Sequence, residues 1–551
     1  MGALELIYFG VIRFILPVIS LLILFISAKT VLHGLKRKTL AKFAVESYAD
    51  IVEVKSSESI IGSGIMCDVR IKRGGINRQH ALLSLTDYGF KITPMAEDCK
   101  LYVNDYLVED EAYLQSGDKL KIGNTVLQIA INPAINPKAK AKSDKAAKSG
   151  RLCSALLLTV FQLLCGVAFI LHNPKEFQAV AIAFGGTMLL EWVYMLIRGF
   201  KSNVGVEISA FFLSTIGLCI AASATPEMLI KKFVFLGAGF ILYILLLLIL
   251  NNIELVEKLV IPVGVLAVLL LLTNLALGTS LNGARNWIII GGVSFQPSEF
   301  VKVAFVFVSA CSLDRMIKTK NIMSFLAFTG VCLISLAIMR DFGTAAVYFA
   351  TLLVILSLRL CDIKFIVALG GGAALCFGAL IKVIPYISAR FATYRHAWEY
   401  ANSSGYQQTR TMMSIASGGL FGLGAGNGTL SSVSAADTDL VFGMVAEEFG
   451  LIVALVVALI PIIYLIYAAV CIPRTRSIYY GVTAAAAAAM FIIQTALNIF
   501  GSVDLLPLTG VTVPFVSNGG SSMLASFMLL AFIKTAGSKI ITLEKKEGAS
   551  K

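Results

Sequence analysis

A polar segment between residues 390 and 450 carries the side chains best suited to chemistry. Two strongly apolar runs flank it, and it is rich in glycine and hydroxyl residues. Arg390 and Arg395 stand near its start, and Asp439 stands where the next apolar run begins. Connections of this length in a compact protein are usually functional or disordered, and an acid at the mouth of a membrane helix indicates a functional site. The pattern predicts that Asp439 performs chemistry at a membrane surface, with Asp437 as the alternative carboxylate.

Two further acids follow Asp439 in the same apolar run. At about 1.5 Å per residue, Glu447 would lie about 12 Å deeper than Asp439 in a helix, inside a hydrocarbon core of about 30 Å. A carboxylate at that depth must be paired or protonated. We therefore expect Glu447 and Glu448 to fix helix packing or to contact a ligand.

A second polar segment, residues 278–296, leads into the sequence Gln296-Pro297-Ser298-Glu299. The early proline and the acid in the first turn favour the start of a helix. Glu299 and Lys302 are spaced to pair on one face of that helix. Two interpretations stay open: an ion pair that pins the helix, or a site in which Lys302 and Arg285 bind a polyanion at the outer surface.

Polar groups also mark the ends of other apolar runs. Asp341 lies between two such runs, where capping of the following helix is favoured over catalysis. Residues 506–522 are rich in glycine, proline and hydroxyl side chains, which indicates re-entrant backbone buried in protein or lining a cavity. Gln494 and Asn498 share one face of the preceding run, either as interhelical hydrogen-bonding groups or as part of a site.

The composition requires a membrane to cover these elements. Of 551 residues, 57% are hydrophobic and only 14% are charged, which defines a polytopic α-helical membrane protein. The net charge of +13 is concentrated in short loops and at the chain ends, so it indicates topology and contact with anionic lipid rather than nucleic-acid binding. The ten cysteines form no CxxC pair and are expected to be small hydrophobic residues rather than disulfides or metal ligands.

About thirteen transmembrane helices are expected from the apolar runs. They fall near residues 6–29, 152–171, 177–197, 205–224, 231–250, 257–277, 298–313, 322–340, 344–360, 364–385, 440–471, 479–501 and 512–534. Basic residues follow the first run and recur in alternate loops, which places the N-terminus outside and the C-terminus in the cytoplasm of a cytoplasmic membrane. The loops at 278–296, 386–438 and 503–511 then lie outside.

Residues 46–132 differ from the rest of the chain, because short β-prone runs alternate there with turn residues, as in an all-β sandwich. The segment resembles a forkhead-associated (FHA) domain through Gly62-Ser63, Asn77-Arg78-Gln79-His80 and Ser116-Gly117-Asp118. FHA domains bind phosphothreonine peptides. Ser63 replaces the family's arginine and Asn77 its serine, and anion capture needs such donors. We therefore expect a cytoplasmic module that docks a protein partner, with phosphothreonine binding as the weaker alternative.

The apolar part of the chain resembles the SEDS family (shape, elongation, division, sporulation), typified by FtsW and RodA. The resemblance covers about residues 205–535 and is carried by motifs in order along the chain. These are Gly283-Ala284-Arg285-x-Trp287, Gln296-Pro297-Ser298-Glu299-x-x-Lys302, Asp341-Phe342-Gly343-Thr344, Gly405-Tyr406-Gln407, Thr438-Asp439, Glu447-Glu448-x-Gly450, Pro507-Leu508-Thr509-Gly510 and Ser517-x-Gly519-Gly520-Ser521-Ser522. Asn518 stands where the family usually has tyrosine, and Arg340 stands where it has proline.

The resemblance implies a peptidoglycan glycosyltransferase that polymerises lipid II at the outer face of the membrane, together with a class B penicillin-binding protein, for division, elongation or sporulation. Asp439 aligns with the family's catalytic aspartate and would act as general base on the acceptor hydroxyl. A divalent cation, Mg or Mn, or cationic side chains would stabilise the departing pyrophosphate. The candidate substrate-binding and pyrophosphate-binding residues are Arg285, Lys302, Arg390, Arg395, Gln407, Glu299, Glu448 and Ser521.

The predicted organisation has six parts. They are an N-terminal anchor (1–45), the FHA-like domain (46–132), a flexible basic linker (133–151), two additional transmembrane helices (152–204), a ten-helix SEDS core (205–538) and a cytoplasmic tail (539–551). Two other functions stay open: a lipid II flippase or transporter, and a non-catalytic scaffold for a penicillin-binding protein. A flippase should need ionisable groups on both sides of the bilayer centre, whereas the polar loops here lie nearly all outside, which favours synthesis.

Overall fold

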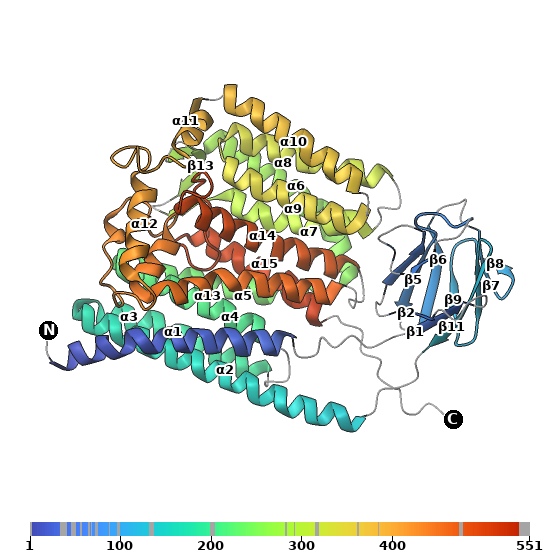
Figure 1. Ribbon diagram of the computed structural model, residues 1–551, viewed down its shortest axis with the longest axis horizontal. Coiled ribbons are helices and arrows are strands. Elements are labelled where there is room, and N and C mark those ends of the chain that lie inside the picture. The colour runs from blue at the N-terminus through green and yellow to red at the C-terminus, as the bar shows by residue number, and fades with distance from the viewer. Residues whose placement is uncertain are drawn as a thin grey trace.

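The protein combines a body of packed helices with a β-sandwich (Figure 1). The computed structural model describes residues 3–32, 41–45, 51–54, 58–63, 67, 69–71, 75–86, 89–95, 100–131, 137–198, 204–281, 284–290, 293–314, 319–360, 363–383, 385–472 and 478–538. The predicted tail 539–551 lies outside the described residues.

The N-terminal domain is the predicted β-sandwich. Its strands are β1 (Ala41–Val45), β2 (Ile51–Val54), β3 (Glu58–Gly62), β4 (Val69–Arg70), β5 (Ala81–Thr86), β6 (Gly89–Pro94), β7 (Leu101–Val103), β8 (Tyr106–Leu107), β9 (Ala112–Leu114), β10 (Lys119–Ile122) and β11 (Thr125–Ile131). One sheet has six strands in the order β2-β1-β11-β10-β7-β8, and the other has five in the order β4-β3-β5-β6-β9. Alternate residues of β11, such as Leu127 and Ile129, are buried in the core, as the period of two along a strand requires.

Two boundaries of this region differ from the prediction. Strand β1 begins at Ala41, inside the segment assigned to the anchor, because its residues pair with β11 to extend the sheet. The linker predicted to be flexible at 133–151 is helical from Pro137 onward, as the first part of α2. Its alanine and lysine residues have high intrinsic helix propensity, which the prediction overlooked.

Each of the thirteen predicted spans contains a helix. These are α1 (Ala3–Leu32), α2 (Pro137–His172), α3 (Phe177–Arg198), α4 (Gly205–Ala224), α5 (Leu229–Leu250), α6 (Ile253–Leu277), α7 (Pro297–Asp314), α8 (Thr319–Ile338), α9 (Phe342–Leu360), α10 (Ile363–Val383), α13 (Val441–Cys471), α14 (Ile478–Ser502) and α15 (Gly520–Ser538). Among the described residues, nine helices are long and apolar enough to cross a membrane, and α8, α9 and α10 contain shorter apolar stretches. The chain is a multi-pass membrane protein.

The polar connections contain structure that the apolar runs do not predict. Residues 278–296 form a three-stranded sheet of β12 (Thr279–Leu281), β13 (Ala284–Ile290) and β14 (Val293–Phe295). The long segment before α13 contains two short helices, α11 (Pro385–Thr393) and α12 (Tyr406–Gly418). Helix α15 begins at Gly520 rather than near residue 512, because the preceding residues form irregular backbone whose apolar side chains, such as Val513 and Val516, are buried.

Helix α13 is broken at Gly450, where the backbone has φ 88° and ψ 162°. This conformation is almost confined to glycine. The break brings the chain against the loop after α12: Leu451 N donates to Gly419 O over 2.9 Å, and a Cβ on Gly450 would lie 2.2 Å from Leu420 O. The predicted span over 440–471 is present as α13, and this residue divides it into two segments.

Candidate active site

A cavity of about 400 Å³ lies where several helix ends meet. Its walls come from β13, the α8–α9 turn, α11, the residues before α13 and the irregular segment before α15. Four charged residues line it: Arg340, Asp341, Arg390 and Asp439. The remaining lining mixes amides and hydroxyls with apolar side chains, which is the usual composition of a small-molecule site.

Asp439 lies half-buried in this lining, just before α13. Burial raises the pKa of its carboxyl group, while Thr438 and the positive charge of Arg390 oppose that rise. A carboxylate whose pKa is raised towards neutrality is better matched to accepting a proton at physiological pH. The geometry therefore permits Asp439 to act as a general base on a group in the cavity.

The backbone around Asp439 is fixed by side chains from the segment and helix opposite. Asn498 Nδ2 donates to the carbonyl oxygens of Asp439 (3.0 Å) and Val511 (2.8 Å). Ser517 Oγ donates to Thr438 O over 2.7 Å. These bonds join α14, the 511–517 segment and the residues before α13, so Asn498 has the hydrogen-bonding role that was one of its two predicted alternatives.

Arg390 reaches the cavity from α11. Its Nη1 donates to Leu508 O over 2.7 Å, which holds the guanidinium in the lining. Gly510 lies close to the acid, with φ 70°, and a Cβ there would be 3.4 Å from Asp439 Oδ2. The site therefore brings one acid and one guanidinium together across three segments that are far apart in the sequence.

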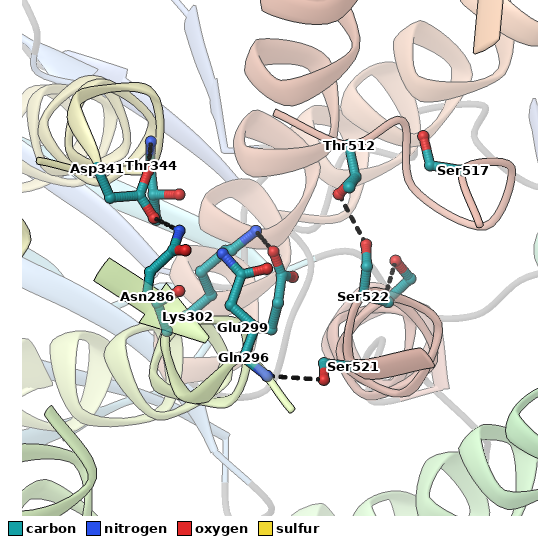
Figure 2. Close-up of polar contacts among 12 residues, drawn as sticks. Asn286, Gln296, Glu299, Lys302, Asp341, Thr344, Thr512, Ser517, Ser521 and Ser522 are labelled. Carbon is teal, nitrogen blue, oxygen red and sulfur yellow. Dashed lines mark hydrogen bonds and ion pairs between the residues drawn. The ribbon is translucent and has the colours of Figure 1, made fainter. Parts of the chain in front are cut away.

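Asp341 is a helix cap, as predicted. Its Oδ1 accepts from Thr344 N over 3.0 Å, and its Oδ2 accepts from Asn286 Nδ2 over 2.8 Å (Figure 2). A side-chain acceptor for an amide of the first turn is the ordinary N-cap arrangement. Asp341 lines the cavity, but both of its oxygens are engaged in fixing α9 and β13.

Glu299 and Lys302 form the predicted ion pair, with 2.7 Å between Lys302 Nζ and Glu299 Oε1 (Figure 2). Both side chains are buried in α7, and neither lines the cavity. The pair neutralises both charges inside the protein, so the structure favours the helix-pinning interpretation over the polyanion site. Ser521, by contrast, does line the cavity, and its Oγ accepts from Gln296 N over 3.0 Å.

Four other candidates lie outside the cavity lining. Arg285 is exposed on β13, and Arg395 is exposed with its guanidinium 5.4 Å from the Tyr394 ring centre. Gln407 Nε2 donates to Ser434 O over 2.9 Å. Glu448 lies in α13 and accepts from Gly426 N in the loop after α12. The structure therefore does not support direct contact between these four side chains and a substrate in this cavity. Sequence spacing could not predict this, because spacing does not fix the direction of a side chain.

Glu447 and Glu448 hold the loop between α12 and α13. Glu448 Oε2 accepts from Gly426 N over 2.9 Å and Oε1 accepts from Ser223 Oγ. Glu447 accepts from the backbone of Thr429 and Leu430 at 3.0 Å each. The two acids therefore fix packing, one of the predicted alternatives, and polar loop atoms surround them rather than the hydrocarbon inferred from helix depth.

Asp437, the alternative base, is engaged elsewhere. Its Oδ2 accepts from Asn518 Nδ2 over 2.8 Å and its carbonyl accepts from Asn518 N over 2.8 Å. Asp437 is also absent from the described lining of the cavity, whereas Asn518 is present there. The geometry favours Asp439 over Asp437 as the residue that meets a ligand.

Arg340 and Trp287 also line the cavity, although neither was among the predicted site residues. Both were visible in the motifs: Trp287 follows Arg285 and Asn286, and Arg340 precedes the cap Asp341. Among the described residues, no group of three or more His, Cys, Asp or Glu side chains gathers as a metal site.

The fold and cavity together define a multi-pass helical membrane protein with a cavity lined by charged and polar residues at the helix ends. The family model of the FtsW, RodA and SpoVE proteins, described as "Cell cycle protein", matches residues 156–539, and the chain belongs to this family. A second model, "Inner membrane component of T3SS, cytoplasmic domain", matches residues 48–132.

Individual proteins and structures agree with the family. A protein of Dichelobacter nodosus named "Probable peptidoglycan glycosyltransferase FtsW" is 28% identical over 68% of this chain and 95% of its own length. A structure titled "Structural coordination of polymerization and crosslinking by a peptidoglycan synthase complex" shares the fold, with a TM-score of 0.52 and 24% identity over 61% of this chain and 97% of its own. The N-terminal sandwich is similar to the FHA domain of the CT664 protein of Chlamydia trachomatis, at 18% identity over 17% of this chain and 97% of that domain, with a TM-score of 0.16.

Proposed function

We propose that this protein is a peptidoglycan glycosyltransferase that polymerises lipid II. The observation that carries the proposal is the position of Asp439, which is half-buried in the cavity lining that also contains Arg390, whose positive charge acts on it. Membership of the FtsW, RodA and SpoVE family, with relatives named as peptidoglycan glycosyltransferases, supports it.

The two charged groups suit the two demands of glycosyl transfer. Asp439 accepts the proton of the acceptor sugar hydroxyl as its oxygen bonds to the anomeric carbon of the donor. The bond from that carbon to the diphosphate oxygen breaks, and its electron pair leaves with the polyprenyl diphosphate. Arg390, held by Leu508 O, provides a fixed positive charge for this departing group.

The cavity offers a divalent cation few protein ligands. Asp341 uses both oxygens on Thr344 and Asn286, so Asp439 is the lining carboxylate available in the described residues. Magnesium is commonly held by one or two carboxylates plus substrate phosphates and water. A cation here would therefore be held by Asp439 and by the substrate, and it would supply charge stabilisation for the diphosphate.

The same proposal includes orientation and partners. The cavity is lined by connections between helices and by the helix ends beside them, and the distribution of basic residues places these connections outside. The N-terminus and the cavity therefore face outward, and the sandwich faces the cytoplasm. A class B penicillin-binding protein is the expected partner of the helical body. The sandwich would dock a cytoplasmic protein that serves division, elongation or sporulation.

The deciding experiment is a polymerisation assay with purified protein and lipid II, with and without the penicillin-binding partner. Wild type should form glycan strands, and Asp437→Asn should retain polymerisation. Asp439→Asn should lose at least 100-fold in polymerisation rate, which is the lower end of what general-base catalysis contributes. Equal rates for wild type and Asp439→Asn would remove the proposed base. Lack of turnover by wild type with its partner would favour the transporter or scaffold alternatives.

A further inference from the structure

Arg340 lines the cavity from the α8–α9 turn, whereas Arg390 lines it from α11. Its side chain is exposed, and within the described residues the structure shows no hydrogen bond made by its guanidinium. Of the other charged residues in the lining, Arg390 donates to Leu508 O and Asp341 accepts from Thr344 and Asn286, whereas Asp439 is the proposed base. A guanidinium offers five N–H donors in a planar fork that suits phosphate oxygens.

The backbone of Arg340 provides a second, independent observation. Its φ is 61°, in the left-handed region that favours glycine. Arg340 N donates to Ala337 O over 3.1 Å, and Asp341 N donates to Leu336 O over 2.9 Å. These two bonds form a Schellman motif that ends α8, in which Arg340 occupies the position usually filled by glycine. An arginine at a glycine position opposes local backbone preference, and such exceptions are a basis for inferring function.

The proposed reaction gives this arginine a specific ligand. Both substrates of glycan polymerisation are lipid-linked diphosphates: the donor loses its diphosphate, and the acceptor keeps it. The donor's diphosphate must lie beside the reacting carbon, and therefore near Asp439, where the charge of Arg390 acts. The acceptor's diphosphate is separated from its attacking hydroxyl by a disaccharide, so it must lie in another part of the cavity.

We propose that Arg340 binds the diphosphate that the acceptor lipid retains, while Arg390 faces the diphosphate that leaves. This assignment rests on the proposed polymerase function. It makes the α8–α9 turn a second anion subsite and gives the two arginines separable roles: Arg340 acts on substrate binding, and Arg390 acts on the chemical step.

Arg340→Gly tests the assignment, because a binding role and a structural role predict opposite results. Glycine suits the left-handed backbone, so the variant should melt at the wild-type temperature or higher. Loss of a charge-assisted contact should raise KM for lipid II about 10-fold or more, with kcat within about 3-fold. Arg340→Gln should also raise KM, and Arg340→Lys should give an intermediate KM because the charge remains without the fork.

Arg395 provides a matched control, since it is an exposed arginine with φ 64° that lies outside the cavity lining. Arg395→Gly should leave KM at the wild-type value. An unchanged KM in Arg340→Gly, or a fall in melting temperature that accounts for its loss of activity, would overturn the proposal. The assays use nanodiscs of zwitterionic lipid, so a KM effect seen only when anionic lipid is added would assign Arg340 to lipid headgroups instead.

Inorganic pyrophosphate separates this proposal from the polymerase function. Wild type should bind pyrophosphate more tightly than Arg340→Gly, as measured by titration of the purified protein. If wild type shows no polymerisation but this difference persists, the anion subsite stands and the polymerase proposal fails. Equal pyrophosphate affinities in the two proteins would count against the subsite even if both polymerise.

Discussion

Asp439 experiences opposing influences on its protonation. Burial disfavours the charged carboxylate and raises the pKa, whereas Arg390 and Thr438 favour the charged form. A general base works only when it is deprotonated. Activity should therefore be present above the raised pKa of Asp439 and be lost as the pH falls through it.

Arg390→Gln should move this acidic limb of the pH profile to higher pH. The substitution removes a positive charge that lowers the pKa of Asp439, so more of the base is protonated at any given pH. The measurement is kcat/KM for lipid II against pH in wild type and variant, with Arg395→Gln as a control outside the cavity. A limb that stays in place or moves to lower pH would show that Arg390 does not act on the base, whatever happens to the maximal rate.

At the scale of elements, the loop between α12 and α13 depends on the break at Gly450. The backbone there has φ 88° and ψ 162°, and the two acids just before the break accept hydrogen bonds from loop amides. Helix α13 thus begins with a short segment that carries these two acids, and it continues past the break as an apolar span.

Gly450→Ala should destabilise the protein by about 3 kcal/mol or more, because the glycine-only conformation alone is worth about 1–3 kcal/mol. The added Cβ would also lie 2.2 Å from Leu420 O. Gly330→Ala in α8 is the control, since a Cβ there meets nothing within 4 Å and alanine is the better helix former by about 1 kcal/mol. Thermal unfolding in detergent gives the comparison. Equal melting temperatures for the two variants would contradict the role assigned to the break.

The element scale also shows what the sequence could and could not predict. Apolar runs predicted the thirteen spans because burial in lipid requires continuous apolar residues. They could not predict α12, whose side chains are of mixed polarity and follow no long apolar run, or the break at Gly450, which depends on contact with a distant loop. Spacing predicted the pair Glu299–Lys302, but it could not show that this pair lies outside the cavity.

For the whole molecule, one buried polar cluster links α3, one of the two additional spans, to the core. Lys534 Nζ of α15 pairs with Glu207 of α4 at 2.7 Å. Tyr194 of α3 and Tyr243 of α5 both donate to Glu207 Oε1, at 2.5 Å and 2.8 Å. Helix α5 packs against both α4 and α15. The cluster therefore joins the helix α3 to three helices of the core.

Lys534→Met should destabilise the protein by about 3–5 kcal/mol, because it leaves the carboxylate of Glu207 buried without its charge partner. The double variant Lys534→Met/Glu207→Gln should recover most of this loss, since a neutral amide oxygen can still accept from both tyrosines. The surface pair Lys91–Glu111, 2.8 Å apart but with 28% and 49% of its side chains exposed, is the matched control. Lys91→Met should change stability by less than about 1 kcal/mol.

Chemical unfolding in detergent, followed by circular dichroism in the helix and strand bands, separates the possibilities for this cluster. If Lys534→Met greatly lowers the free energy of unfolding and the double variant restores it, the unpaired charge is the cause. A loss that the double variant does not reverse would instead indicate that the lysine stem fills space that methionine cannot. If Lys534→Met changed stability as little as Lys91→Met, the buried ion pair would not hold the helices together.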